Sequence, residues 1–247
     1  MVVADTGIAP WPASLQAPYE VIDARSCTPT IRELWLRPLT QSLDHAAGEF
    51  VLLGDDERAV PERSYSVANA PRPDGLISLL ITRVPGGRTS SWAHDTLRVG
   101  DRVVVSGPYG TFLDDPRATA PGLFLAAGSG VAPIRALLEA GLQTGLRASV
   151  TMILSARTEA DVVSREEFLS LERRHPRFRF IRTLTRASGT PPHGRIPALL
   201  PDLDLDLSDH DVFIAGAPGF VQACGVAAEA SGASTSRVQK EEFFVDA

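Results

Sequence analysis

The residues best suited to bind an anion form a glycine turn, Gly128-Ser129-Gly130. The apolar run before it, from Leu123 to Ala127, predicts a buried strand, and the apolar residues after it have helical spacing. Small turn residues let the backbone approach a phosphate, and the amides and positive dipole end of the helix point toward it. Pro133 replaces the third glycine of Gly-x-Gly-x-x-Gly, which a first helical turn tolerates. The turn therefore predicts a dinucleotide site, with an ordinary strand-to-helix connection as the alternative.

A second set of candidate residues, Arg63-Ser64-Tyr65-Ser66, lies in a polar stretch of the first half. It combines a guanidinium fork for a phosphate, an aromatic ring for stacking and a hydroxyl that can bond a heteroatom. Alternate residues of a strand face the same side, so such groups can converge on one ligand. A solvent-facing polar strand is the plain alternative. Downstream, Gly86-Gly87-Arg88-Thr89-Ser90 is another glycine turn into a short helix, with the composition of a phosphate cradle.

Composition limits the chemistry that the chain can perform. Its formal net charge of -6 argues against a nucleic-acid binder, which needs a basic surface. Cys27 and Cys224 are far apart in sequence, so neither a disulfide framework, a zinc site nor an iron–sulfur cluster is expected, and no other metal site is predicted. No charge-free apolar run reaches the roughly 18 residues of a membrane span. Residues 1–18 do not resemble a signal peptide, which predicts a cytoplasmic protein.

The candidate residues must be positioned by two different kinds of sheet. In the first half, short alternating runs separated by turns predict an antiparallel barrel with strands at 19–25, 30–37, 49–54, 64–69, 76–84 and 101–106 and a short helix at 89–97. After a linker at 114–121, strands alternate with helices, which predicts a parallel sheet with helices on both faces. The expected strands are 122–127, 148–155, 178–184, 211–215 and 235–239, and the expected helices are 131–143, 164–174 and 218–230.

The predicted fold class is therefore β plus α/β, a β-barrel followed by a Rossmann-like parallel-sheet unit. We assign residues 17–113 to the first domain and 121–247 to the second. Ser164 and Glu167 have the spacing of a capping box at the start of the helix 164–174, and His175-Pro176 would end it.

Four motifs, taken in order, resemble the ferredoxin–NADP⁺ reductase superfamily of flavoenzymes, and within it the reductase components of bacterial oxygenase and cytochrome P450 systems. They are Arg-x-Tyr-Ser at 63–66, Gly-x-x-Ser at 87–90, Gly-Pro-x-Gly-x-Phe at 107–112 and Gly-x-Gly-x-x-Pro at 128–133. The resemblance extends over residues 19–244. It implies that the barrel binds FAD and that the Rossmann-like unit binds NADPH or NADH.

The resemblance also implies roles for individual residues around the flavin. Arg63 would bind the FAD pyrophosphate, Tyr65 would stack on the isoalloxazine, and Ser66 would hydrogen-bond near the flavin N5. The flavin site would be completed by Val67 and by the second turn, Gly87, Arg88, Thr89 and Ser90. The Gly-Pro-x-Gly form at 107–110 resembles the branch of the family that binds FAD rather than FMN.

Other residues would bind the nucleotide or approach both cofactors. Gly128, Ser129 and Gly130 would cover the nucleotide pyrophosphate, and Gly216 and Ala217 end the strand where the family places a cysteine near the nicotinamide. Arg157, Thr185 and Arg186 follow two strand ends where the family binds the 2′-phosphate of NADPH, so NADPH is favoured over NADH. The alternative is that both arginines are exposed loop residues that bind no nucleotide. The tail resembles the family's ending, in which an acid and an aromatic residue lie near the flavin. The two would be either Glu241 and Phe243 or Glu242 and Phe244, and a plain edge strand is the alternative.

Two departures from the family affect the predicted function. Ala215 occupies the position of the cysteine, which should slow hydride transfer without abolishing it. The cysteine run of a fused ferredoxin domain is absent, so electrons would pass to a separate partner. The first interpretation is an FAD-dependent NAD(P)H oxidoreductase, catalytic through Tyr65, Ser66, Glu241 and Phe243, that delivers single electrons to a ferredoxin, an oxygenase or a P450.

Alternative interpretations change the acceptor or the role. One is a reductase for free flavin, quinone or another small molecule, and another is a flavin-binding regulatory subunit with little turnover. For an acidic protein acceptor, the docking patch would be the arginines at 83, 88, 98 and 102. The acceptor, the pathway and the oligomeric state are left open by the sequence.

Overall fold

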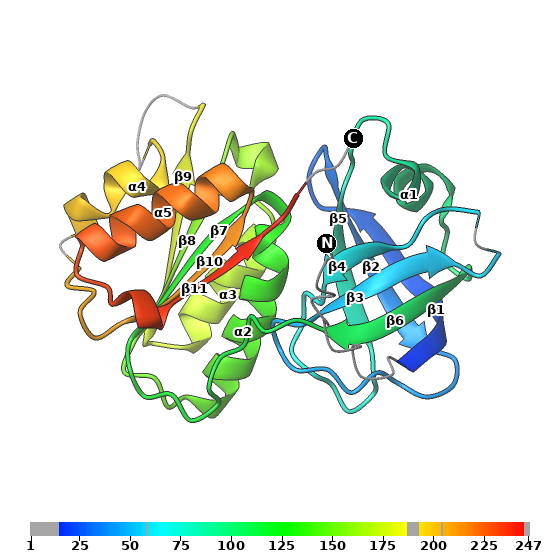
Figure 1. The fold of residues 1–247 in the computed structure, drawn as a ribbon, viewed down its shortest axis with the longest axis horizontal. Coiled ribbons are helices and arrows are strands. Elements are labelled where there is room, and N and C mark those ends of the chain that lie inside the picture. Colours follow the sequence, from blue (N-terminus) through cyan, green and yellow to red (C-terminus); the bar gives the residue numbers. More distant parts are fainter. Residues whose placement is uncertain (1–14, 58, 187–192, 204, 245–247) are drawn as a thin grey trace, which may run out of the picture.

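The protein forms two sheets that lie side by side in a computed structural model (Figure 1). The structure describes residues 15–57, 59–186, 193–203 and 205–244. One sheet has six antiparallel strands in the order β4-β3-β6-β1-β2-β5, and the other has five parallel strands in the order β11-β10-β7-β8-β9. The predicted fold class, an antiparallel barrel and a Rossmann-like parallel sheet, is confirmed.

The antiparallel sheet curls until its two outer strands meet. Its strands are β1 (Leu15–Ser26), β2 (Ile31–Pro38), β3 (Phe50–Asp55), β4 (Arg63–Ser66), β5 (Ile77–Thr82) and β6 (Arg102–Tyr109). Just beyond β4, Val67 bridges to Leu79 of β5, and the Ala68 amide donates to the Ser78 carbonyl at 2.8 Å. These contacts nearly close the barrel, and alternate strand residues fill its interior with apolar side chains.

The helix expected at 89–97 forms as two short pieces, α1 (Arg88–Ser91) and the π-helical η1 (Trp92–Thr96). Arg32 of β2 fixes this segment against the barrel. Its guanidinium donates to the carbonyl oxygens of Ala93 and His94 at 2.7 and 2.8 Å. A cation at the end of a helical segment satisfies carbonyls that have no partner inside the helix.

The parallel sheet lies between two layers of helices. Its strands are β7 (Gly122–Ala127), β8 (Val150–Ala156), β9 (Phe178–Leu184), β10 (Asp211–Gly216) and β11 (Val238–Glu242). The helices are α2 (Val131–Thr144), α3 (Arg165–Arg174), α4 (Ile196–Leu199) and α5 (Pro218–Ala230), with 3₁₀ turns η2 (Gly128–Gly130), η3 (Glu159–Asp161), η4 (Pro201–Leu203) and η5 (Thr235–Arg237). Within β7, Phe124 packs with residues of α2 and α3, whereas Leu123 packs with α4 and α5. Successive residues of β7 therefore pack alternately on the helices of the two sheet faces.

The last strand and the start of one helix differ most from the predictions in this half, and the strand expected at 148–155 begins two residues later, as β8. The last strand, expected at 235–239, begins three residues later, because 235–237 form the turn η5. Ser164 does not cap α3: its φ is 53°, its side chain makes no cap hydrogen bond, and it contacts Arg135 instead. A capping box does occur one turn earlier in the chain, between Thr158 and Asp161.

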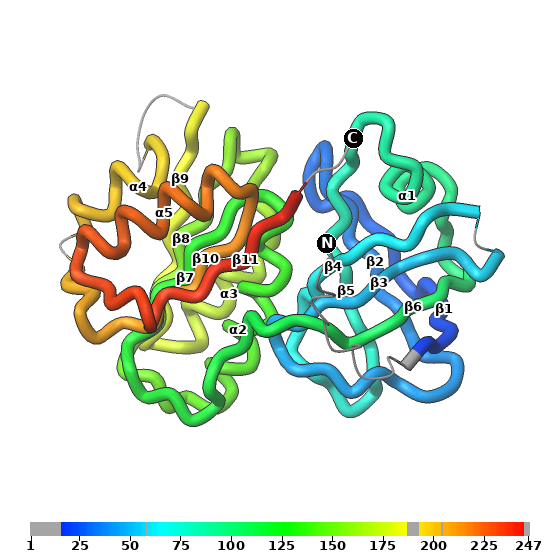
Figure 2. The backbone as a smooth tube through the Cα atoms, viewed as in Figure 1, coloured from blue at the N-terminus to red at the C-terminus, as the bar shows by residue number. Residues whose placement is uncertain are grey.

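Helix α2 joins the two sheets. Figure 2 shows it on the side of the parallel sheet that faces the barrel. One apolar cluster combines residues of α2, such as Ile134 and Leu138, with Ile31, Ala68 and Leu80 of the barrel side. The two halves thus share a buried core. Within the described part of the chain, no helix is long and apolar enough to cross a membrane.

Candidate functional site at the junction of the two sheets

The glycine turn η2 lies at the carboxyl end of the parallel sheet, directly after β7. Gly130 packs so closely on β10 that a Cβ atom there would lie 2.2 Å from the carbonyl oxygen of Ala215. Gly128 has a φ of 58°, and a Cβ atom there would meet open space. One glycine therefore permits close packing, and the other permits the left-handed turn that leaves the backbone accessible.

A pocket of about 200 Å³ opens beside this turn, between the two halves of the chain. Thr28, Thr30 and Ile31 line it from the barrel side. The ends of β7, β8 and β9 contribute Ala127, Gly128, Ser155, Ala156, Arg157, Asp161 and Thr185. The pocket lies where an open parallel sheet usually binds a nucleotide, outside the carboxyl ends of its strands.

The structure brings together the three residues predicted to select the nucleotide. The Arg186 amide donates to the Arg157 carbonyl, and the Thr185 amide donates to the Ala156 carbonyl, each at 2.9 Å. Both arginines are exposed. Arg157 and Thr185 line the pocket, and Arg186 follows the end of the adjacent strand beside Arg157.

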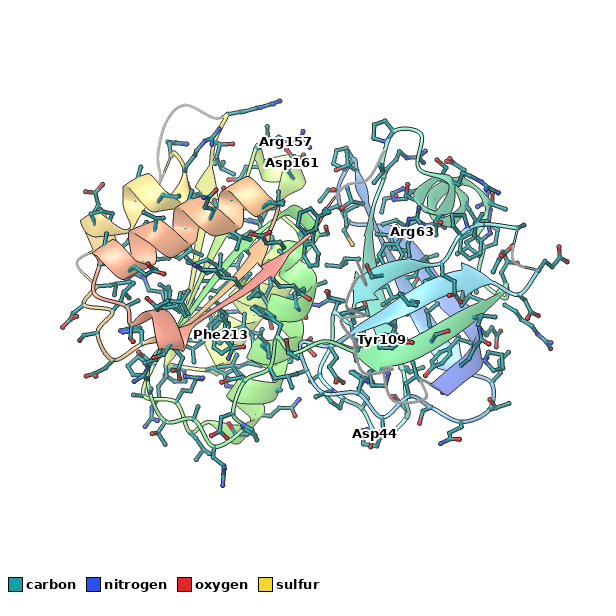
Figure 3. All side chains as sticks on the ribbon, viewed as in Figure 1. Asp44, Arg63, Tyr109, Arg157, Asp161 and Phe213 are labelled. Carbon is teal, nitrogen blue, oxygen red and sulfur yellow. The ribbon has the colours of Figure 1, made fainter. Side chains whose placement is uncertain are left out.

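Sequence reasoning missed Asp161, which also lines this pocket. Its Oδ1 lies 3.5 Å from a guanidinium nitrogen of Arg157, and Figure 3 shows the two residues next to each other at one end of the parallel sheet. Its Oδ2 accepts hydrogen bonds from the amide and hydroxyl of Thr158 at 3.1 and 2.8 Å. The Thr-x-x-Asp spacing was the available signal, because it marks a capping box.

On the barrel side, strand β4 carries the residues predicted to bind flavin. Arg63 is exposed and donates to the carbonyl of its neighbour Glu62 at 2.9 Å; Figure 3 places it on the barrel. Tyr65 is half-buried, and burial raises the pKa of its hydroxyl to about 12, so this hydroxyl remains protonated. Val67 is fully buried: its side chain belongs to the barrel core, and its amide donates to the Glu49 carbonyl at 2.9 Å.

In the second glycine turn, the side chains serve the loop rather than a ligand. Thr89 donates to the Pro61 carbonyl at 2.5 Å, and the Ser90 hydroxyl accepts from the Val84 amide at 3.1 Å. Both hydroxyl residues are buried, whereas Arg88 is exposed. Helix α1 begins after Gly87 with no side-chain cap. An anion here would therefore meet backbone amides and the Arg88 guanidinium before any hydroxyl.

The last strand carries an acid across to the barrel. Glu241 pairs with Ala215 in the parallel ladder, and its carboxylate oxygens lie 3.4 and 3.5 Å from the Ser66 hydroxyl. Burial raises the pKa of Glu241 to about 7, although the hydrogen bond from Ser66 acts in the opposite direction. A carboxyl group that titrates near neutral pH can hold or release a proton at this point.

The same strand settles which acid of the tail faces the barrel. Glu242 is exposed, whereas Glu241 contacts Ser66. The Phe243 amide donates to the Gly216 carbonyl at 2.9 Å, and its side chain packs against the core. Phe244 is 71% exposed, and Ala217 is exposed at the start of α5. Ala215, in the position of the family cysteine, is fully buried.

These residues fit a flavin dinucleotide on one side of the junction and a nicotinamide nucleotide on the other. The barrel offers an exposed guanidinium, a half-buried aromatic ring and an uncapped helix start. The parallel sheet offers the glycine turn and a pocket lined by Arg157, with the exposed Arg186 beside it at the end of the adjacent strand. Among the described residues, no group of three or more histidines, cysteines, aspartates or glutamates is arranged to hold a metal ion.

Comparison with known proteins gives two family matches in succession. An oxidoreductase FAD-binding domain matches residues 24–113, and an oxidoreductase NAD-binding domain matches residues 124–225. Ferredoxin–NADP reductase B of Sorangium cellulosum (strain So ce56) is 34% identical over 197 residues, which are 77% of this chain and 80% of that protein.

Two further relatives are a monooxygenase reductase component and a cytochrome P450 reductase. The reductase component of propane 2-monooxygenase from Rhodococcus jostii (strain RHA1) is 29% identical; the match covers 73% of this chain and 51% of that protein, so the chain spans about half of it. The crystal structure of the Amycolatopsis cytochrome P450 reductase GcoB superposes with a TM-score of 0.85 at 26% identity, covering 93% of this chain and 70% of that one.

Proposed function

This chain belongs to the ferredoxin–NADP⁺ reductase superfamily, and from that premise we propose that it takes a hydride from NAD(P)H into FAD and passes single electrons to a separate ferredoxin, oxygenase or cytochrome P450. One observation carries the proposal. Ser66 of the barrel and Glu241 of the last strand, 3.4 Å apart, bring the predicted flavin site to the carboxyl edge of the nucleotide-binding sheet. Hydride transfer requires two cofactors to be held in contact, and this is where the halves meet.

FAD, when bound, supplies the acceptor for a hydride and the means to release electrons one at a time. The chain's own residues bind and orient the two cofactors. Arg63 pairs with the flavin pyrophosphate, and the ring of Tyr65 stacks against the isoalloxazine. In the structure the Ser66 hydroxyl donates to the Glu241 carboxylate. When Glu241 is protonated, its carboxyl can donate to Ser66 instead, which would free the Ser66 proton for the flavin edge.

We favour NADPH as the donor. Arg157 and Arg186 extend from adjacent strand ends, and a guanidinium facing a 2′-phosphate contributes about 1.5–3 kcal/mol as a charge-assisted bond. Asp161 is the acid that would bind the free 2′-hydroxyl of NADH. Its Oδ2 already accepts two hydrogen bonds from Thr158, and Arg157 lies beside its Oδ1, so this carboxylate is engaged.

An acidic protein acceptor would dock on the arginine-rich side of the barrel. All four arginines of the predicted patch, at 83, 88, 98 and 102, are exposed. Arg83 pairs with Asp95 at 2.6 Å, and Arg98 donates to the Asp95 carbonyl at 2.8 Å, so both surround the helical segment that covers the barrel. Positive charge of this kind accelerates encounter with an acidic partner and is screened by salt.

The experiment that tests the proposal starts from the absorbance of the purified protein. We expect a flavin spectrum, loss of flavin absorbance on anaerobic addition of NADPH, and turnover with a ferredoxin that slows as salt rises. Substituting Arg83 and Arg98 by glutamine should flatten the salt profile of ferredoxin reduction and leave ferricyanide reduction unchanged. An unaltered salt profile would count against the patch, and a protein that binds no FAD and consumes neither nucleotide would refute the whole proposal.

The same measurements separate the alternatives. Turnover with free flavin or quinone but not with ferredoxin would indicate a small-molecule reductase. Flavin binding without turnover would indicate a regulatory subunit, a role consistent with Ala215 in place of a cysteine. We also propose a cytoplasmic location, where reduced nicotinamide nucleotides are supplied.

A further inference from the structure

Arg135 of helix α2 is buried where the two halves of the chain meet. Its side chain is 2% exposed. One guanidinium nitrogen donates to Glu33 of β2 at 2.6 Å and to Ser78 of β5 at 2.9 Å. Another donates to Ser164 at 3.0 Å and to Glu167 of α3 at 3.3 Å. One side chain of the parallel-sheet half is thus bonded to two strands of the barrel.

A second pair of contacts connects α2 to the segment that follows β4. Arg135 Nε donates to the carbonyl oxygen of Ala68. One helical turn later, Glu139 accepts a hydrogen bond from the Ala70 amide at 2.8 Å. Residues i and i+4 lie on the same face of a helix, so α2 holds a carbonyl and an amide of one short segment. Together with the contact between Ser66 and Glu241, the second half touches alternate residues 66, 68 and 70.

Helix α2 connects these contacts to the glycine turn of the predicted nucleotide site. The helix begins at Val131, directly after the turn Gly128–Gly130. The segment that it holds begins two residues after Ser66. We propose that Arg135, assisted by Glu139, is a positioning residue that fixes the glycine turn relative to Ser66 and so sets the distance between nicotinamide and flavin; this inference rests on the proposed function.

The charges around Arg135 favour one geometry over others. Glu33 is fully buried; burial opposes its ionisation, but Arg135, Ser78 and Arg25 together hold the pKa of its carboxyl below the usual range. A buried ion pair contributes little net stability, yet any shift of the halves would leave these buried groups without their partners. The network therefore disfavours any displacement of one half relative to the other, and contributes little to the overall stability of the fold.

The test compares Arg135 with a matched arginine of the same half. Arg147 is 3% exposed and pairs with two acids, Asp114 and Asp211, which both lie outside the barrel strands. The variants are R135K, R147K and the double variant R135Q/E33Q, which serves if R135K fails to fold. The double variant removes both charges of the buried pair and leaves without this partner only Arg25 and Glu167, whose side chains are 59% and 34% exposed.

The first measurement is the rate at which saturating NADPH removes the flavin absorbance in an anaerobic single turnover. We expect R135K and the double variant to be about 10–100-fold slower than the wild type, since a displacement of about 1 Å costs that much. The NADPH concentration for half-maximal rate should change by less than about 3-fold, because the proposed nucleotide contacts lie in the parallel-sheet half. R147K should react at the wild-type rate, and reoxidation of dithionite-reduced protein by ferricyanide should be unchanged in all variants.

The second measurement is hydrogen exchange in the flavin-free protein. Peptides that cover residues 64–72 should exchange faster in both Arg135 variants but not in R147K. Wild-type rates of flavin reduction in R135K, or an equal loss in R147K, would overturn the inference while leaving the proposed function intact. A wild-type protein that NADPH does not reduce would overturn the proposed function and the positioning role with it, whereas the exchange data would still report whether Arg135 holds the segment.

Discussion

The carboxyl group of Glu241 should make the stability of the flavin-free protein depend on pH. Burial raises its pKa from an ordinary value of 4.5 to about 7. The replacement Glu241→Gln keeps the shape of the side chain but cannot ionise. A shift of this size corresponds to about 3 kcal/mol between the two protonation states.

The sign follows from which state holds the proton. Below the pKa of the unfolded chain, both states are protonated and the group contributes nothing to the pH dependence. As pH rises from about 4.5 toward 7, the unfolded chain releases its proton while the folded protein keeps it, so stability falls. Above pH 7 the full cost of about 3 kcal/mol is reached, and Glu241→Gln escapes it.

Urea unfolding followed by circular dichroism measures this difference. Relative to the wild type, Glu241→Gln should gain less than about 1 kcal/mol near pH 5 and about 2–3 kcal/mol near pH 8.5. Glu242→Gln is the matched control, because Glu242 is the next residue of the same strand and is exposed. A gain for Glu241→Gln that does not grow with pH, or one that Glu242→Gln reproduces, would refute the reasoning.

Two further substitutions test the nucleotide side. Gly130→Ala should weaken NADPH binding by more than about 10-fold in titrations of the FAD-loaded protein without lowering FAD content, because its Cβ would lie 2.2 Å from the Ala215 carbonyl oxygen. Gly219→Ala, where a Cβ meets nothing within 4 Å, should bind normally. Arg186→Ala should lower the ratio of kcat/KM for NADPH over NADH by about 10-fold or more, in line with the loss of a charge-assisted bond. Arg182→Ala removes an arginine that pairs with Glu159 instead, and it should leave the ratio unchanged.

Local patterns predicted the bounds of two elements of the parallel-sheet half. The strand 122–127 and the helix 218–230 were predicted with the bounds that the structure has, because apolar periodicity and a proline at the helix start are local signals. The predicted strand 64–69 ends earlier, at Ser66, because the chain leaves β4 to bridge to β5 and meet α2. That bend depends on residues distant in sequence and leaves no local pattern.

The contacts of Arg135 show what a single sequence does not contain. Glu33 and Arg135 are 102 residues apart, and nothing in either stretch indicates that they pair. Ser164 and Glu167 were assigned to a capping box because their spacing fits one. In the structure both side chains bond Arg135 instead, because a buried guanidinium needs acceptors, whereas the partly exposed amides of the helix start can bond water.

The junction between the two halves contains buried acids as well as Arg135, so its net charge depends on pH. Burial raises the pKa of Glu139 to about 7, against the opposing effects of the Ala70 amide and Arg135 and with a smaller contribution from Glu167. Glu139 and Glu241 thus change charge over the same pH range, on two elements that hold one short segment of the barrel. Arg135 donates to that segment between them, and its fixed charge favours the ionised form of Glu139. The arginine therefore matters most above neutral pH, where the acids on either side of it have lost their protons and their burial is least favourable.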